Sequence, residues 1–230
     1  MIATTLLATL ILAATTPSAP TRIEAEYRVS TNGMVIGRVL ETYERDGNRY
    51  RIESVTRSEG PLKIFLDDAV TLRSSGRVGP KGLEPEHFEH LRARDASRDI
   101  RATFDWKAGQ LRSEFRGENR VEPLPAGTQD RISILYQFMN IPAPGDEVRM
   151  PMSNGRKVEH YAYRKAAEVR LSTPAGDFDT LHYERITESA SESRAEFWLA
   201  RDRFRLPVRI VLDDPKGFRL DQMLVRLTVR

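Results

Sequence analysis

Residues 22–33 read RIEAEYRVSTNG, in which apolar and charged side chains alternate along most of the stretch before the pair Asn32-Gly33. A period of two is typical of a β-strand with one buried and one exposed face. Asn and Gly both tolerate a positive φ, so Asn32-Gly33 predicts a tight turn. Two further strands are predicted at 35–46 and 49–57, separated by the turn pair Gly47-Asn48. The N-terminal region therefore predicts antiparallel strands joined by hairpins.

The same pattern continues along the chain, giving about a dozen strands joined mainly by short turns. The later predicted strands begin at residue 70 and then cover 83–93, 98–106, 110–116, 147–152, 157–164, 167–172, 178–187, 194–200, 206–213 and 218–229, with a polar loop at 117–127. Open sheets of more than about 10 strands tend to curl or split. We expect an all-β fold with one or two short helices, an antiparallel β-meander curled into a barrel or half-barrel. We expect residues 20–230 to form this single domain.

One helix is predicted at 129–140, capped by Thr128 or Asp130 and stopped by the prolines that follow. It carries an apolar stripe of Ile132, Leu135, Tyr136 and Met139, and Ile134 and Phe138 widen the apolar surface beyond that stripe. We expect this helix at the mouth of the barrel, as a permanent plug or as a lid over a cavity. A second, short helical turn is possible at 62–66.

The first residues of the chain have the character of an export signal. Residues 1–20 contain no charged side chain, and residues 2–14 are apolar with interspersed Thr. That stretch is too short to span a bilayer and has the length of a signal-peptide core. We predict a cleaved signal at 1–19 and a mature protein in the bacterial periplasm, with secretion as the alternative. No membrane span is expected in the mature chain.

Composition excludes several classes of protein. The 230 residues include no cysteine, which excludes disulfides, a thiol nucleophile and a thiolate zinc site. The 36 basic and 33 acidic residues are interleaved and leave a formal charge of +3, with no pure Lys/Arg run. We therefore expect no nucleic-acid partner.

Four passages of the chain resemble a known family. They are Tyr27-Arg28-Val29 with Gly37 beyond it, the run from Pro125 to Ser133, the run from Thr173 to Phe178, and Phe197-Trp198-Leu199-Ala200 continuing to Leu206-Pro207-Val208-Arg209. Together they are similar to the proteobacterial exported proteins of domain-of-unknown-function family 3108. The resemblance implies an envelope location and an antiparallel β-rich fold. It implies no activity and no catalytic residues.

Motifs that carry chemistry are missing from the sequence. We find no nucleophile elbow, zinc helix, phosphate loop or dinucleotide fingerprint. His87 and His90 would diverge on a strand because they are three residues apart. His160 and His182 fall on separate strands and could meet only through an unknown register. We therefore expect no catalytic residues, no metal site and no cofactor, and we expect the protein not to be an enzyme.

The leading hypothesis is a periplasmic protein whose barrel interior or mouth binds an apolar or amphipathic envelope molecule such as a lipid. Arginines at one end of the barrel could hold a phosphate or carboxylate head group, and the helix could contact the apolar body. The candidate ligand-binding residues are Arg92, Arg94, Arg98, Arg101, Leu135, Tyr136, Phe138 and Met139. One alternative is a structural or interaction protein of an envelope assembly, with an envelope protein as partner and a filled barrel. A further alternative is a hydrolase of envelope glycans or lipids.

Overall fold

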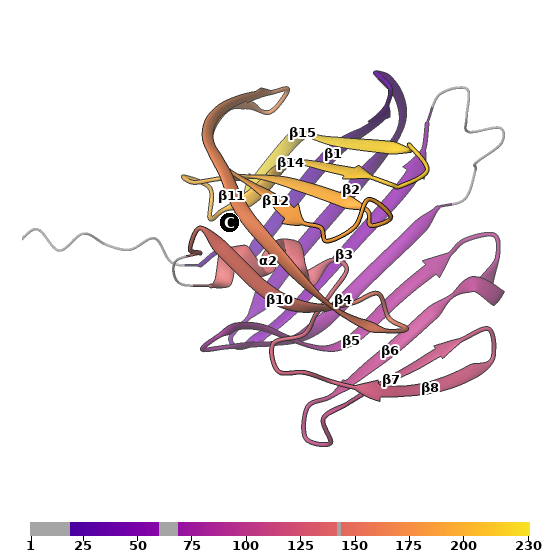
Figure 1. Ribbon diagram of the computed structural model, residues 1–230. Coiled ribbons are helices and arrows are strands. Elements are labelled where there is room, and N and C mark those ends of the chain that lie inside the picture. The colour runs from indigo at the N-terminus through magenta and orange to yellow at the C-terminus, as the bar shows by residue number, and fades with distance from the viewer. Residues whose placement is uncertain (1–18, 60–68, 142–143) are drawn as a thin grey trace, which may run out of the picture.

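A single β-sheet curls around one helix in the computed structural model, which describes residues 19–59, 69–141 and 144–230 (Figure 1). The predicted signal at 1–19, apart from its last residue, and the helical turn predicted at 62–66 lie outside the described residues. Within these ranges no helix has the length and apolar character needed to cross a membrane.

The sheet has 15 strands. The first eight are β1 (Arg22–Thr31), β2 (Met34–Asp46), β3 (Arg49–Ser58), β4 (Val70–Gly79), β5 (Gly82–Arg92), β6 (Ile100–Asp105), β7 (Gln110–Phe115) and β8 (Glu118–Pro123). The other seven are β9 (Gln129–Asp130), β10 (Glu147–Ser153), β11 (Val158–Thr173), β12 (Gly176–Ile186), β13 (Arg194–Ala200), β14 (Leu206–Asp213) and β15 (Arg219–Val229). A short 3₁₀ turn, η2 (Ala96–Arg98), connects β5 to β6.

The strand order is that of two meanders joined at their ends. It runs from β8 back to β1, continues with β15, and then runs back to β9. All neighbouring strands are antiparallel except β9 and β10, which are parallel. The sheet stays open, with β8 and β9 at its edges, so the predicted all-β, curled half-barrel is confirmed and a closed barrel is not formed.

The polar loop predicted at 117–127 was wrong in its first half, which forms the edge strand β8. Nearly all side chains of β8 are exposed, because the strand pairs on one side only and both of its faces meet solvent. Such a strand shows no alternation of apolar and polar residues, so hydropathy gave no signal for it.

The helix is shorter than predicted. It is α2 (Ser133–Asn140), while Gln129 and Asp130 form the short strand β9 beside β10. Asp130 is the capping group, since its Oδ1 accepts hydrogen bonds from the backbone N–H groups of Ile132 and Ser133 at 3.0 and 2.8 Å. Thr128 does not cap the helix; its hydroxyl donates to the carbonyl of Pro125. Asp130 therefore pairs in β9 through its backbone and caps the helix through its side chain.

The helix lies within the curl, between the strands of the two meanders (Figure 1). On one side the ring of Tyr136 stacks on Tyr43 of β2, with ring centroids 5.2 Å apart. On the other side Phe138 is fully buried against aromatic rings of β11, β12 and β13. The helix therefore supplies the central part of the core.

The helix is also tied to the β4–β5 hairpin through Gln137. The Oε1 atom of Gln137 accepts a hydrogen bond from the N–H of Leu83 at 2.7 Å, and its Nε2 donates to the carbonyl of Lys81 at 3.0 Å. Gly82 lies between these two residues with φ of +107°, and a Cβ there would come within 2.3 Å of Gln137 Oε1. Glycine is therefore required at this position on both conformational and steric grounds.

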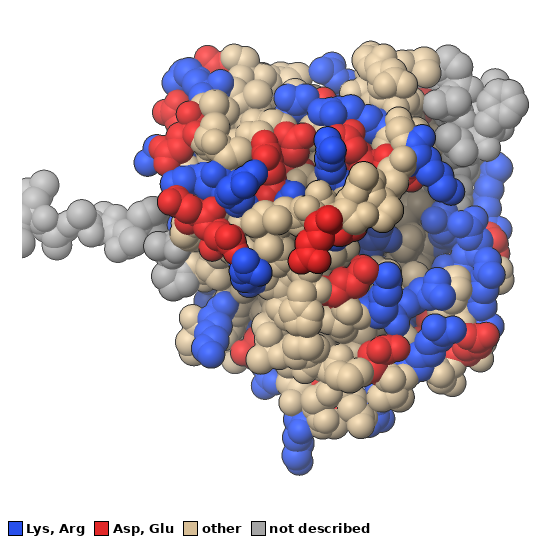
Figure 2. All heavy atoms as spheres, viewed as in Figure 1, with Lys and Arg blue, Asp and Glu red and all other residues tan. Residues whose placement is uncertain are grey.

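Basic and acidic side chains are interspersed over the face of the molecule shown in Figure 2. Over the described surface as a whole, many charged side chains form ion pairs between neighbouring strands, for example Arg73 of β4 with Glu53 of β3 at 2.6 Å. Exposed ion pairs of this kind contribute little to the stability of the fold.

Candidate functional site

A cavity of about 570 Å³ lies inside the curl, beside the helix. Its wall is mainly apolar and comes from the N-terminal strands, the helix and the C-terminal strands; it includes Val39, Leu72, Ile132, Ile134, Leu135, Met152, Phe197, Ile210 and Leu220. The lining also includes Asp214 and Phe218, which are exposed, so the cavity reaches the surface near the β14–β15 turn. Its volume is within the range of about 300–1,000 Å³ found for small-molecule sites.

Cationic groups gather in one part of this wall. Arg92, at the end of β5, and Arg131, just before the helix, both line the cavity. Arg131 makes no ion pair with any carboxylate of the described residues, and its side chain is exposed to the cavity. An arginine without a carboxylate partner, beside apolar surface, is suited to hold an anionic group through its planar pair of N–H donors.

His90 lies in the same part of the wall. The residue is only 8% exposed, and neither ring nitrogen has a hydrogen-bond partner among the residues that the structure describes. Burial, together with the nearby charges of Arg131 and Arg92, lowers the pKa of His90 from 6.5 to about 4. The ring is therefore neutral at physiological pH, with one nitrogen a donor and the other an acceptor, and both nitrogens are covered by protein atoms.

Glu41 of β2 is the one fully buried carboxyl group that lines the cavity among the described residues. It accepts hydrogen bonds from the hydroxyls of Ser54 and Tyr136, each at 3.1 Å. Burial raises its pKa from 4.5 to about 7, although both hydrogen bonds act in the opposite direction. Near neutral pH this wall is thus partly uncharged, which keeps the cavity compatible with an apolar molecule.

Arg185 of β12 covers another part of the wall. Its guanidinium lies 3.7 Å from the ring centroid of Tyr161 and donates to Glu192 at 3.0 Å and to the carbonyl of Ser193 at 2.9 Å. Its charge is therefore already compensated, unlike that of Arg131. The acidic residue Asp213, near the opening, is likewise paired, with Arg219 at 3.0 Å.

The structure separates the eight candidate ligand-binding residues into three groups. Arg92 and Leu135 line the cavity. Tyr136 and Phe138 are buried in the core, and Met139 packs against it. Arg94, Arg98 and Arg101 belong to the β5–β6 connection and the start of β6, and none of them lines the cavity.

Arg101 shows why the expected row of arginines does not form. Side chains alternate along β6, so Arg101 points away from Ile100 and Ala102, which are buried. Its guanidinium instead pairs with Asp99 at 3.3 Å and Glu89 at 3.6 Å on the outer face.

Sequence reasoning did not identify Arg131, His90 or Glu41 as site residues. Arg131 and His90 are brought together only by the return of the chain after β8, which no local pattern specifies. The sequence pattern could have pointed to Glu41. It lies between Val39 and Tyr43 on the face of the predicted strand where apolar, buried residues are expected. A carboxylate at a buried strand position is uncommon unless it is partnered or functional.

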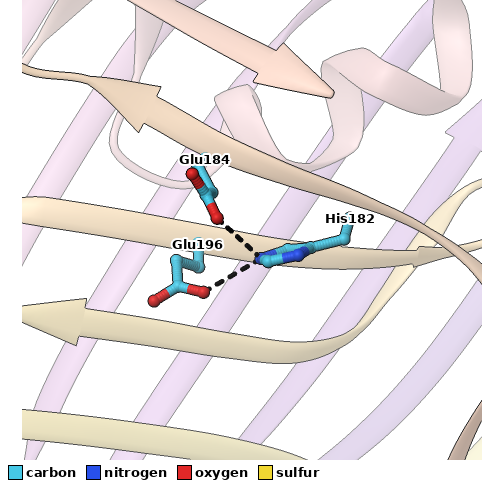
Figure 3. Close-up of side chains that lie close together, drawn as sticks. All are labelled: His182, Glu184 and Glu196. Carbon is cyan, nitrogen blue, oxygen red and sulfur yellow. Dashed lines mark hydrogen bonds and ion pairs between the residues drawn. The ribbon is translucent and has the colours of Figure 1, made fainter. Parts of the chain in front are cut away.

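A second cluster of polar groups lies on the opposite face of the sheet (Figure 3). The Nε2 atom of His182 is 2.9 Å from Oε2 of Glu196 and 4.0 Å from Oε1 of Glu184. His182 and Glu184 are on β12 and Glu196 is on β13, and their ligand atoms all lie within 4.8 Å of one another. Adjacent residues on these strands, such as Phe197, face the cavity, so this cluster is separate from it.

Comparisons with known proteins identify a family and no activity. Residues 26–223 match a family model described as "Protein of unknown function (DUF3108)". No curated protein matches the sequence. Among solved structures, a candidate lipoprotein from Parabacteroides distasonis is 11% identical with a TM-score of 0.38, covering 92% of this chain and 97% of its own. A candidate exported protein with a YmcC-like fold from Bacteroides fragilis is 9% identical with a TM-score of 0.34 and the same coverages.

Proposed function

Since the chain belongs to the DUF3108 family, whose function is unknown, its role has to come from its own residues, and we propose that it binds an amphipathic molecule with an apolar body and an anionic head group. A lipid or fatty acid of the cell envelope has this chemistry. The observation that carries the proposal is an apolar cavity with the unpaired guanidinium of Arg131 in its wall.

The apolar lining and the arginines of the cavity would bind different parts of the molecule. The apolar lining near Leu135 and Phe197 would take up the hydrocarbon body, which gains about 25 cal/mol per Å² of surface removed from water. Arg131 and Arg92 would hold a carboxylate or phosphate.

We propose binding without chemical conversion. The most reactive group in the wall, Glu41, already accepts hydrogen bonds from Ser54 and Tyr136 and so has a structural role. We further propose an envelope location, which the apolar segment at 1–19 supports. N-terminal sequencing of the protein from the native envelope tests that location: a chain starting near residue 20 is expected, and an intact Met1 would contradict cleavage.

The binding proposal can be tested with a fluorescent long-chain fatty acid and its methyl ester, which shares the apolar body and lacks the charge. We expect saturable binding of both, with the acid bound more tightly. Arg131→Gln should weaken binding of the acid by about tenfold or more, because a charge-assisted hydrogen bond contributes about 1.5–3 kcal/mol, and should leave the ester unaffected. Arg120→Gln, on the edge strand β8 and paired with Glu118 at 3.1 Å, is the matched control.

Filling the cavity provides a separate test of the apolar part. Leu135→Trp should reduce binding of both probes, since the larger side chain occupies the space that the hydrocarbon needs. If neither probe binds saturably to the original protein, or if Arg120→Gln weakens the acid as much as Arg131→Gln, the proposal is wrong. The interaction protein and the envelope hydrolase would then be the remaining hypotheses.

A further inference from the structure

The cluster of His182, Glu184 and Glu196 brings two carboxylates and one imidazole together on neighbouring strands. Glu184 and Glu196 are directly opposite each other in the β12–β13 register. Like charges at directly opposite positions destabilise a sheet. Glu184 has a cationic neighbour in Arg164, whose guanidinium is 4.0 Å away, and Glu196 contacts His182 and interacts electrostatically with Arg209. A cation between the two carboxylates would remove their repulsion.

His182 is held so that its Nε2 points at both carboxylates (Figure 3). Its ring stacks on Trp198, with centroids 4.1 Å apart and planes 8° from parallel. Trp198 is in turn covered by the guanidinium of Arg209, which is fixed by an ion pair with Asp221 at 2.6 Å. The side chain of His182 is 13% exposed, so the ring has little freedom to turn away. A ligand held in its binding orientation loses little entropy when an ion binds.

We propose that His182, Glu184 and Glu196 bind one divalent first-row transition-metal ion, with zinc as the type case. Nitrogen and oxygen ligands lie about 2.0–2.2 Å from zinc, which places ligand atoms about 3.4 Å apart around a tetrahedral centre. The separations here, from 2.9 Å up to 4.8 Å, bracket that value and need only small side-chain rotations.

The chemistry of the ligand set defines the class of ion. One imidazole and two carboxylates supply two negative charges, which match a divalent ion. The imidazole favours zinc and its transition-metal neighbours over calcium and magnesium, which prefer oxygen ligands only. Three protein ligands leave at least one position for water or for a group from another molecule. The site faces away from the cavity, so it does not depend on the proposed binding of an amphipathic molecule.

The test uses the whole mature chain after treatment with a chelator. Native mass spectrometry and titration with Zn²⁺ against a chromophoric chelator should show one zinc ion per chain. Glu196→Gln and Glu184→Gln should each weaken zinc binding by at least about tenfold, since even residues that only support a ligand cost about 10–100-fold when they are changed. Substitution by Co²⁺ should give a d–d absorption spectrum that both variants alter.

Two control variants separate this site from other places where zinc could bind. Glu168→Gln removes an exposed carboxylate that pairs with Arg201 at 2.8 Å, and His160→Ala removes an exposed histidine of β11. Both should bind zinc like the original protein, and circular dichroism without zinc should show that all variants are folded. The proposal is overturned if no stoichiometric zinc binds, if the Glu184→Gln/Glu196→Gln double variant keeps its affinity, or if His160→Ala loses it.

Discussion

The hydroxyl of Tyr136 in the helix donates a hydrogen bond to Glu41 of β2, 95 residues earlier in the chain, at an O–O distance of 3.1 Å. This contact joins the helix to the N-terminal meander through a carboxyl group that is fully removed from solvent. A group of this kind makes the stability of the fold depend on pH.

Glu41→Gln should remove part of that dependence. Burial raises the pKa of Glu41 to about 7 in the folded chain, so between pH 4.5 and 7 the folded chain holds a proton that the unfolded chain has released. The free energy of unfolding therefore falls as the pH rises through this window, by about 3 kcal/mol, and is constant above it. Gln has no proton to lose, so the variant should gain stability relative to the original protein between pH 5 and pH 8.

Urea denaturation at several pH values measures this difference. Asp130, whose pKa burial raises to about 6, contributes a smaller loss of stability of the same sign between about pH 4 and 6, and that loss should persist in the variant. Equal pH profiles for the two proteins would show that Glu41 is ionised in the folded chain without cost.

His90→Leu should change the pH profile in the opposite sense. The pKa of His90 is lowered to about 4, so between pH 6.5 and 4 the unfolded chain binds a proton that the folded chain does not. The original protein should lose about 2–3 kcal/mol of stability as the pH falls through this window, and the variant should not. Titration of the His90 ring by NMR offers a direct check: a ring that protonates near pH 6.5 would contradict the prediction.

Phe138→Ala should be among the most damaging core substitutions. Phe138 has no exposed surface, and its ring centroid lies 5.2–6.3 Å from those of Tyr163, Tyr183 and Phe197. Removing a ring from such a site leaves a cavity and costs about 3–5 kcal/mol. Leu135→Ala, one turn earlier, half-buried and next to an existing cavity, should cost less, near the lower end of the range of about 2–5 kcal/mol for such substitutions. Chemical denaturation of both variants measures the difference, and similar losses would contradict the assigned positions.

Gly82→Ala should destabilise the protein more than Gly109→Ala. Both glycines have positive φ, +107° and +64°, so each substitution incurs backbone strain of about 1–2 kcal/mol. Only at Gly82 does the new Cβ meet another group, Gln137 Oε1, whereas nothing lies within 4 Å at Gly109. The excess loss in thermal denaturation measures the clash together with the greater strain at φ of +107°, which lies outside the left-handed helical region. Because Gln137→Ala also removes two hydrogen bonds, Gly82→Ala is measured again in a Gln137→Ala background. There its effect should be clearly smaller than in the original protein, and an equal effect would show that strain alone is responsible.

The sequence predicts the fold well because the information needed is local. The alternation in β1 and the Asn32-Gly33 turn specify a strand and a hairpin without reference to the rest of the chain. The family resemblance was likewise correct, and residues 26–223 match that family. The predicted start of the helix was wrong because Gln129 and Asp130 pair with β10 instead of joining the helix. That pairing depends on residues more than 20 positions away.

The candidate site is much less predictable. Arg92 and Leu135 were identified, but the cavity depends on how far the sheet curls and on where Arg131 meets His90. The His182–Glu196 contact needs the β12–β13 register, which a sequence does not specify. A sign of it was nevertheless present, because His182 and Glu184 are two residues apart on a strand and share a face.

The pairing of β1 with β15 in the middle of the sheet also bears on the order of folding. Each meander is built from hairpins that can close within microseconds of one another, but the seam joins Ile23 to Val229 across almost the whole described chain. Closing so long a loop is the step with the largest entropic cost, so the seam should form last and set the folding rate. Until it forms, β1 and β15 are unpaired edge strands, and the protein is then most exposed to aggregation.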